Sequence, residues 1–186
     1  MERNLIYRLA GWSAYLSGFA ALLLLITAPV SRVIGLSNNY IGKIAEIVWF
    51  ALIVPIAFAF HRQLRPYANM LSLITLVVGV VGLSYSTVVT FLLNYGTDSF
   101  GDNGVFLTAT IGFWFLVTNS LLFLNKLQPR GLSWLGFLIG ASYVLGLFGL
   151  FLKETLSFLI GIHIVIVILV YPIWAFWTGR VLLKQN

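Results

Sequence analysis

Cysteine is absent from this sequence, which excludes disulfide bonds, thiolate metal sites, iron–sulfur clusters and a cysteine nucleophile. Charged residues are scarce as well. They make up 9% of the 186 residues, whereas an average soluble domain has about 25%. Only two histidines are present, His61 and His163, too few for a histidine-rich metal site. We therefore expect no metal and no cofactor.

Hydrophobic residues account for 60% of the chain, and the mean hydropathy is +1.00. A membrane-spanning helix needs about 20 mainly apolar residues, so six such helices use about 120 residues and leave no space for a soluble domain. The first apolar run is longer than the core of a signal peptide, which has about 7–15 residues, and we expect it to be retained. The sequence predicts a single all-α transmembrane domain over 1–186. Its six expected spans are 9–30, 44–60, 70–93, 105–124, 134–152 and 158–177.

Lysine and arginine are unevenly divided between the two predicted sides of the membrane. One side carries the N-terminus, the C-terminus and the second and fourth connections, and it holds Arg3, Arg8, Arg62, Arg65, Lys126, Arg130, Arg180 and Lys184. The other side holds only Arg32, Lys43 and Lys153. Basic residues favour the cytoplasmic side, so we expect both termini in the cytoplasm. This rule also explains the net charge of +6, so membrane lipids, and not nucleic acid, are the expected partners.

Ionisable side chains inside a membrane are costly, and each is a candidate for function. Glu46 lies about one turn into the second expected span, and His163 lies about five residues into the sixth. Glu46 has an alternative role as an interfacial residue at a helix N-terminus, paired with Lys43. His163 has an alternative role as a hydrogen-bonded packing residue. His61 is expected to face the lipid headgroups on the opposite side, too far from His163 to share a haem iron.

Polar residues and one tryptophan extend this candidate site. A polar stripe in the third span includes Thr87, Thr90 and Asn94, although threonine can also bond its own helix. Trp114 lies near the middle of the fourth span, where it either packs in the core or stacks on a buried ligand. We hypothesise an outward-facing polar pocket between the second, third, fourth and sixth spans. Its ligand-binding residues would be Glu46, Thr87, Thr90, Asn94, Trp114 and His163.

The remaining tryptophans and the small residues suggest how the bundle is held. The other five tryptophans are expected in interfacial belts: Trp12, Trp49, Trp134, Trp174 and Trp177. Small residues recur at helical spacing and allow close approach of helices, as at Ala10, Ala14, Gly18, Gly79, Gly82, Gly136 and Gly140. Packing within one chain is the simpler use of these stripes, and a homo-oligomer is the alternative.

The sequence largely lacks the motifs of known enzyme classes. The segment Gly140-Ala141-Ser142-Tyr143 is similar to the G-x-S-G motif of rhomboid proteases, which pair the serine with a histidine, but its second glycine is missing. Counting from the expected span ends puts Ser142 and His163 at depths that differ by roughly 10 Å. We therefore expect no hydrogen bond between them, and no catalytic residues.

Two segments of the chain resemble a known family. They are Tyr171-Pro172-Ile173-Trp174-Ala175-Phe176-Trp177-Thr178-Gly179-Arg180-Val181-Leu182-Leu183 and Leu127-Gln128-Pro129-Arg130-Gly131-Leu132-Ser133-Trp134-Leu135-Gly136. Both resemble a large family of uncharacterised bacterial six-helix membrane proteins, a domain of unknown function. The resemblance implies six spans and a bacterial cytoplasmic membrane. It implies no activity and no functional residues.

Three functional classes follow. The first is a protein that binds or transports a small molecule or lipid through the outward-facing pocket. The second is a structural or partner-binding membrane subunit that uses the small-residue stripes. The third is an intramembrane enzyme, which the failed motifs disfavour.

Overall fold

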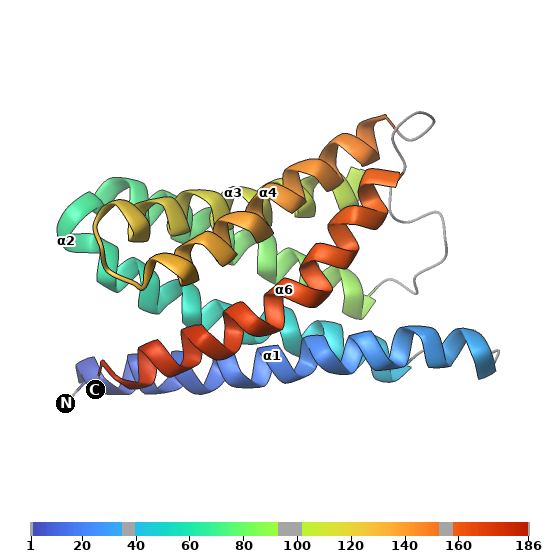
Figure 1. The fold of residues 1–186 in the computed structure, drawn as a ribbon, viewed down its shortest axis with the longest axis horizontal. Coiled ribbons are helices and arrows are strands. Elements are labelled where there is room, and N and C mark those ends of the chain that lie inside the picture. The colour runs from blue at the N-terminus through green and yellow to red at the C-terminus, as the bar shows by residue number, and fades with distance from the viewer. Residues whose placement is uncertain (1, 35–39, 93–101, 153–157, 186) are drawn as a thin grey trace.

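The computed structural model describes residues 2–34, 40–92, 102–152 and 158–185. Within these residues the regular structure is helical throughout. Figure 1 shows the helices, which are α1 (Glu2–Ile34), α2 (Tyr40–Leu92), α3 (Asp102–Leu124), α4 (Arg130–Phe151) and α6 (Phe158–Leu183). The all-α prediction is therefore confirmed.

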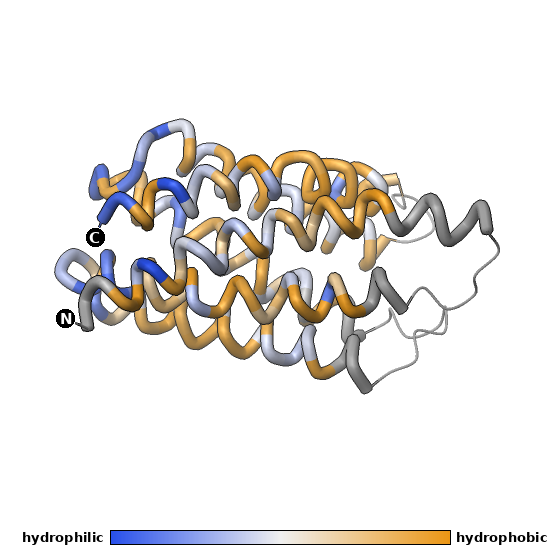
Figure 2. Tube along the Cα trace, turned by 90° about the horizontal axis from the view of Figure 1, so that it is seen from below, coloured by the Kyte–Doolittle hydropathy of each residue, from blue (hydrophilic) through white to orange (hydrophobic). Residues whose placement is uncertain are grey.

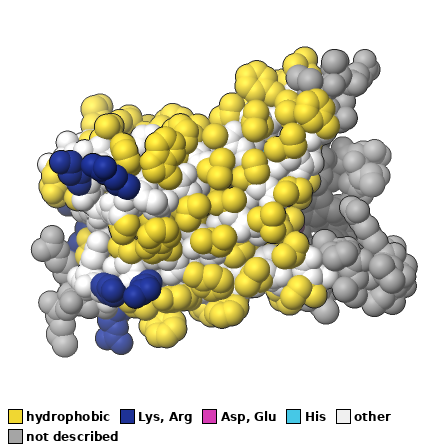
Figure 3. Space-filling view, viewed as in Figure 1, with side chains coloured by type: hydrophobic (Ala, Val, Ile, Leu, Met, Phe, Trp, Pro, Cys, Tyr) yellow, Lys and Arg dark blue, Asp and Glu magenta, His cyan; other side chains and the backbone are white. Residues whose placement is uncertain are grey.

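Four of the helices contain segments long and apolar enough to cross a membrane: Leu5–Ile26, Ile44–Val88, Arg130–Phe151 and Phe158–Leu183. The apolar part of α3 is shorter, at Thr108–Leu124. Large hydrophobic side chains are exposed along these helices, and Figure 3 shows them covering most of the described surface of one face. A surface of this kind is unfavourable in water and typical of a protein that faces lipid.

The second and third expected spans are two helices that meet at a kink, with no loop between them. They form one element, α2, in which the only non-helical residue is Ala68, with φ −150° and ψ 61°. The kink divides α2 into two arms, and Figure 1 shows the chain doubling back there. Pro66, a residue that we expect at a span end or in a loop, lies two residues before the kink, where its missing N–H weakens the helical ladder. Pro55 and Pro172 lie inside α2 and α6 as expected.

Helices α1 and α6 pack side by side in opposite directions. A Cβ atom on Gly11 would lie 2.7 Å from the Leu183 side chain, and one on Gly18 would lie 3.0 Å from Phe176. The start of α1 and the end of α6 therefore lie at the same end of the bundle, as Figure 1 also shows. Further packed pairs are α1 with α2, α2 with α3, α3 with α4, and α4 with α6.

Basic side chains gather at this same end. Gln63, near the kink of α2, donates a hydrogen bond of 2.6 Å to Gln185, and Gly131 of α4 lies against Trp177 of α6. These contacts bring together the segments that carry the basic residues, and Figures 2 and 3 show the hydrophilic and basic residues at one end. We call it the basic end; its described side chains are Arg8, Arg62, Arg65, Lys126, Arg130, Arg180 and Lys184.

Aromatic rings fill the centre of the bundle. Phe115 of α3 contacts Trp114 and Trp174 with ring centroids 4.8 and 5.0 Å away, and Phe60 of α2 contacts both tryptophans. Trp174 was expected in an interfacial belt, but none of its surface is exposed. That expectation was wrong because Trp174 lies on the face of α6 that packs inward, next to Tyr171.

The small-residue stripes are used inside the chain. A Cβ on Gly79 would overlap the Trp114 ring, one on Gly136 would overlap the Asn119 amide, and one on Gly140 would lie 2.8 Å from the backbone nitrogen of Leu116. Ala10 and Ala14 are fully buried. Each stripe thus lets two helices of the same chain approach closely, and none of these glycines is left on the surface for a partner.

Candidate functional site

Hydrogen-bonded polar groups cross the interior between α1 and α6. The Tyr171 hydroxyl donates to Ser17 Oγ at 2.9 Å, and Ser17 in turn donates to the carbonyl of Ala14 at 2.9 Å. Trp49 of α2 packs edge-on against the Tyr171 ring, with centroids 5.0 Å apart. Tyr171 and Ser17 are fully buried. Because the Tyr171 hydroxyl donates its only proton to Ser17, its oxygen can only accept a further hydrogen bond.

Tyr143 of α4 interacts with both candidate ionisable residues, through ring contact with His163 and electrostatically with Glu46. The His163 ring lies against the Tyr143 ring at 4.5 Å, in an edge-to-face arrangement. The carboxyl group of Glu46 and the phenol of Tyr171 both interact electrostatically with the Tyr143 phenol. We call Glu46, Ser142, Tyr143, His163 and Tyr171 the Tyr143 cluster. It draws on three helices, α2, α4 and α6.

Ser142 and His163 lie within hydrogen-bond distance, contrary to the depth estimate from the sequence. Ser142 Oγ and His163 Nδ1 are 3.3 Å apart. The estimate failed because α4 begins at Arg130, four residues before its expected start, a difference of about 6 Å along the helix. In addition, Gly146 has no side chain to keep the His163 ring away from α4.

The hydrogen bonds of Ser142 differ from those expected of an activated nucleophile. Ser142 Oγ donates its single proton to the carbonyl of Ile139 at 2.7 Å, so the proton shared with His163 comes from Nδ1. A catalytic histidine would accept the serine proton instead. Ser142 is also fully buried. In its neutral form His163 then presents a bare acceptor, Nε2, to the site.

His61 forms a similar pair near the basic end. Its Nδ1 lies 3.1 Å from Ser72 Oγ, which donates to the carbonyl of Asn69 at 2.9 Å. The bond joins the two arms of α2 across the kink at Ala68. His61 is half-buried near the basic end, and the reversal of α2 turns Ser72 back toward it.

The other expected site residues do not join the cluster. Thr87 is half-buried, and its hydroxyl donates to the carbonyl of Leu83 in its own helix at 2.9 Å. Trp114 is 1% exposed and packs among Phe60, Phe115 and Gly79. Asn94 and the side chain of Thr90 lie outside the described residues, as does the side chain of Lys43. Of the six candidates, His163 contacts Tyr143 directly, and Glu46 interacts with Tyr143 electrostatically.

Sequence reasoning missed Tyr143, Tyr171 and Ser17. A signal for the tyrosines was present, because a phenol inside a membrane span has a hydroxyl that usually finds a partner. Two buried tyrosines therefore mark polar positions as well as apolar packing. Ser17 gave no such signal, since a serine can satisfy itself on its own helix.

Comparisons with protein-family models, with curated proteins and with solved structures gave no match. Among the described residues no three side chains of the usual metal-binding types lie together. The function must therefore be inferred from the contacts within the Tyr143 cluster.

Proposed function

We propose that this chain is an integral membrane protein with six membrane-spanning segments and with both termini in the cytoplasm. The two arms of α2 would count as separate spans, and α3 would be the fourth. The gathering of basic side chains at one end supports this orientation. The resemblance to the bacterial six-helix family supports placing the protein in a bacterial cytoplasmic membrane.

A reporter fusion tests this orientation. Green fluorescent protein fused after Asn186 should fluoresce, because the basic end should face the cytoplasm. Alkaline phosphatase inserted at 35–39, at the opposite end of α1, should be active in the periplasm. Active alkaline phosphatase after Asn186 would contradict the proposed topology.

We further propose that the protein binds or transports a small molecule, in an outward-facing polar pocket at the Tyr143 cluster. One observation carries this proposal: a buried tyrosine in the bundle stacks edge-on against a histidine at 4.5 Å and interacts electrostatically with a carboxyl group of another helix. Inside a membrane such groups mark paths for solutes, ions or protons. The cluster lies in the half of the bundle away from the basic end, near the starts of α2 and α6.

The chemistry of the cluster favours a cationic or proton-donating solute. Glu46 supplies a carboxylate. The Tyr171 hydroxyl already donates its proton to Ser17, and His163 Nδ1 already pairs with Ser142, so the Tyr171 oxygen and His163 Nε2 are available as acceptors. The Trp49 ring adds an aromatic surface one turn after Glu46 on α2. Carboxylates and aromatic rings together attract ammonium groups. A small amine, or a proton that drives solute movement, is thus the expected ligand class.

The substitution Glu46→Gln keeps the shape of the side chain and removes its charge. We expect methylammonium to bind the wild-type protein in nanodiscs and to bind this variant at least tenfold more weakly, a loss of about 1.4 kcal/mol. Equilibrium dialysis with labelled methylammonium measures the affinity. Native mass spectrometry of gently extracted protein would identify a natural occupant, whose added mass should be absent from Glu46→Gln.

The two histidines provide a matched control. His163→Ala should weaken methylammonium binding, whereas His61→Ala removes a similar pair with serine near the basic end and should leave binding unchanged. Equal binding by wild type and Glu46→Gln would refute the cation site. Loss of binding in His61→Ala alone would place the site at the other end of the bundle.

A further inference from the structure

A groove between α3 and α4 contains two buried polar atoms that have no partner. Asn119 and Ser133 are 1% and 2% exposed, and neither Asn119 Oδ1 nor Ser133 Oγ has a hydrogen-bond partner. The Asn119 amide nitrogen donates to the carbonyl of Phe115 at 2.8 Å, which fixes the oxygen as the free atom. Unpaired buried polar atoms are rare in proteins and call for an explanation.

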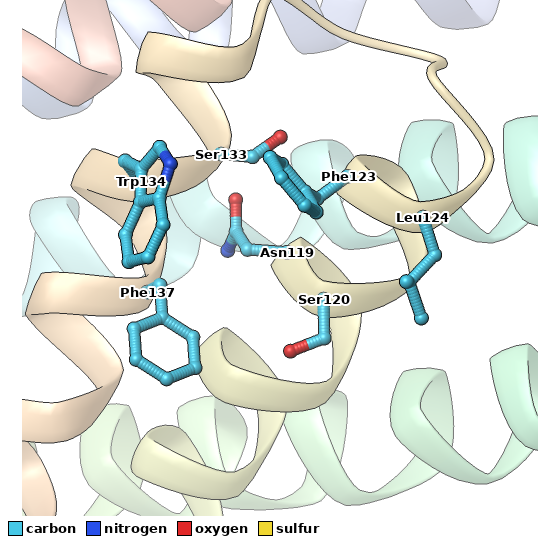
Figure 4. Close-up of a pocket in the computed structure, with 7 residues that line it drawn as sticks. All are labelled: Asn119, Ser120, Phe123, Leu124, Ser133, Trp134 and Phe137. Atoms are coloured by element: carbon cyan, nitrogen blue, oxygen red, sulfur yellow. The ribbon is translucent and has the colours of Figure 1, made fainter.

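The groove around these atoms opens toward the lipid. Its volume is about 230 Å³. Figure 4 shows Asn119 at the centre, with Trp134 and Phe137 of α4 on one side and Phe123 and Leu124 of α3 on the other. These four apolar side chains are all exposed on the outside of the bundle. A ligand could therefore enter sideways from the bilayer.

The size of the groove indicates what kind of ligand it takes. Pockets for whole drug-sized ligands usually measure about 300–1,000 Å³, so 230 Å³ holds only part of an amphiphile. The rest of the ligand would lie along the exposed apolar walls, where acyl chains already pack. A bilayer lipid meets this requirement, and a water-soluble metabolite does not.

The polar atoms indicate the headgroup. Asn119 Oδ1 only accepts hydrogen bonds, and Ser133 Oγ both donates and accepts. A hydroxyl group, which also does both, can donate to Asn119 Oδ1 and accept from Ser133 Oγ. The residues that line the groove carry no charge, and Asn119 lies five residues before the end of α3 at Leu124, about 7 Å below it. A charged phosphate would be costly at that depth.

We infer that this groove binds a membrane lipid whose head is an uncharged hydroxyl, of the diacylglycerol class. The hydroxyl donates to Asn119 Oδ1 and exchanges a second hydrogen bond with Ser133 Oγ. The acyl chains lie against Phe123, Trp134 and Phe137. This site is separate from the Tyr143 cluster and does not depend on the function proposed for it.

The test compares two lipids that differ at the proposed donor, which is free in one and acetylated in the other. Brominated dioleoylglycerol and its 3-acetyl ester are added to the protein in phosphatidylcholine vesicles, and quenching of tryptophan fluorescence reports lipid near Trp134. We expect the free alcohol to quench at about tenfold lower mole fraction, because the ester lacks the hydrogen that Asn119 accepts. Equal quenching by both lipids would overturn the proposal.

Asn125 provides the matched variant. Its amide donates to the carbonyl of Leu121 at 2.8 Å, as Asn119 does to Phe115, but it does not line the groove. Asn119→Leu should abolish the preference for the alcohol, Ser133→Ala should reduce it, and Asn125→Leu should preserve it. Trp134→Phe should remove the selective quenching. A preference that survives in Asn119→Leu, or that disappears in Asn125→Leu, would refute the assignment, even if Asn119→Leu lowers the thermal midpoint.

Discussion

Replacing Gly140 with alanine should destabilise the protein strongly, although the change adds a single methyl group. The new Cβ would lie 2.8 Å from the backbone nitrogen of Leu116 and 2.7 Å from its Cγ. A backbone atom cannot move aside as the end of a side chain can, so α3 and α4 must separate. We expect a loss of about 2–3 kcal/mol in the free energy of unfolding, near the upper end for an overpacked core. A shift in the unfolding midpoint in a denaturing-detergent titration measures it.

Gly161 is the control for this experiment. It lies in α6, and a Cβ there would meet nothing within 4 Å. Gly161→Ala should leave stability unchanged or raise it by up to about 1 kcal/mol, because alanine is the better helix former. Equal effects at the two glycines would show that helix propensity, and not the contact between α3 and α4, decides the outcome.

Trp114→Ala should also be severe. The side chain is 1% exposed, packs on Phe60 and Phe115, and covers Gly79. Removing it leaves a cavity at the centre of the bundle. Truncating a buried aromatic residue to alanine costs about 3–5 kcal/mol in soluble proteins. We expect about 3 kcal/mol here, since lipid solvates apolar groups as well as the protein interior does and only packing is lost.

Trp12→Ala separates this packing effect from the general loss of a tryptophan. Trp12 is 59% exposed, and its ring contact is with Tyr15 of the same helix. Its removal should change the free energy of unfolding by less than about 0.5 kcal/mol, as at other surface sites. If both variants unfolded at the same denaturant concentration, the aromatic core would not be the source of stability.

Helical class and apolar spans could be predicted because they depend on composition and on run length. The tight reversal at Ala68 could not, because the bond between His61 and Ser72 forms only after the chain reverses. Similarly, the interfacial position expected for Trp174 was inferred from its closeness to the end of the sixth expected span. Which side of α6 faces inward depends on the neighbouring helices, and the sequence of α6 alone does not show it.

Of the residues in the candidate site, only the ionisable ones could be singled out from the sequence. Glu46 and His163 stood out because charged and titratable groups are rare in membrane spans. The position of Tyr143 relative to these two residues depends on how α2, α4 and α6 cross. A hydropathy pattern carries no information about that crossing. The depth estimate for Ser142 failed for a related reason: shifting the start of a helix by four residues moves a side chain by more than the length of a hydrogen bond.

The way α2 reverses at Ala68 has a mechanical consequence. The two arms share a continuous backbone and are joined by the bond between His61 and Ser72. Gln63 fastens the same corner to Gln185, and only five residues, 125–129, connect α3 to α4. Side-chain hydrogen bonds thus fasten the basic end of the bundle at the corner where α2 reverses. A mutation that removes one of these bonds, such as His61→Ala, should therefore loosen this corner before it affects the opposite end of the bundle.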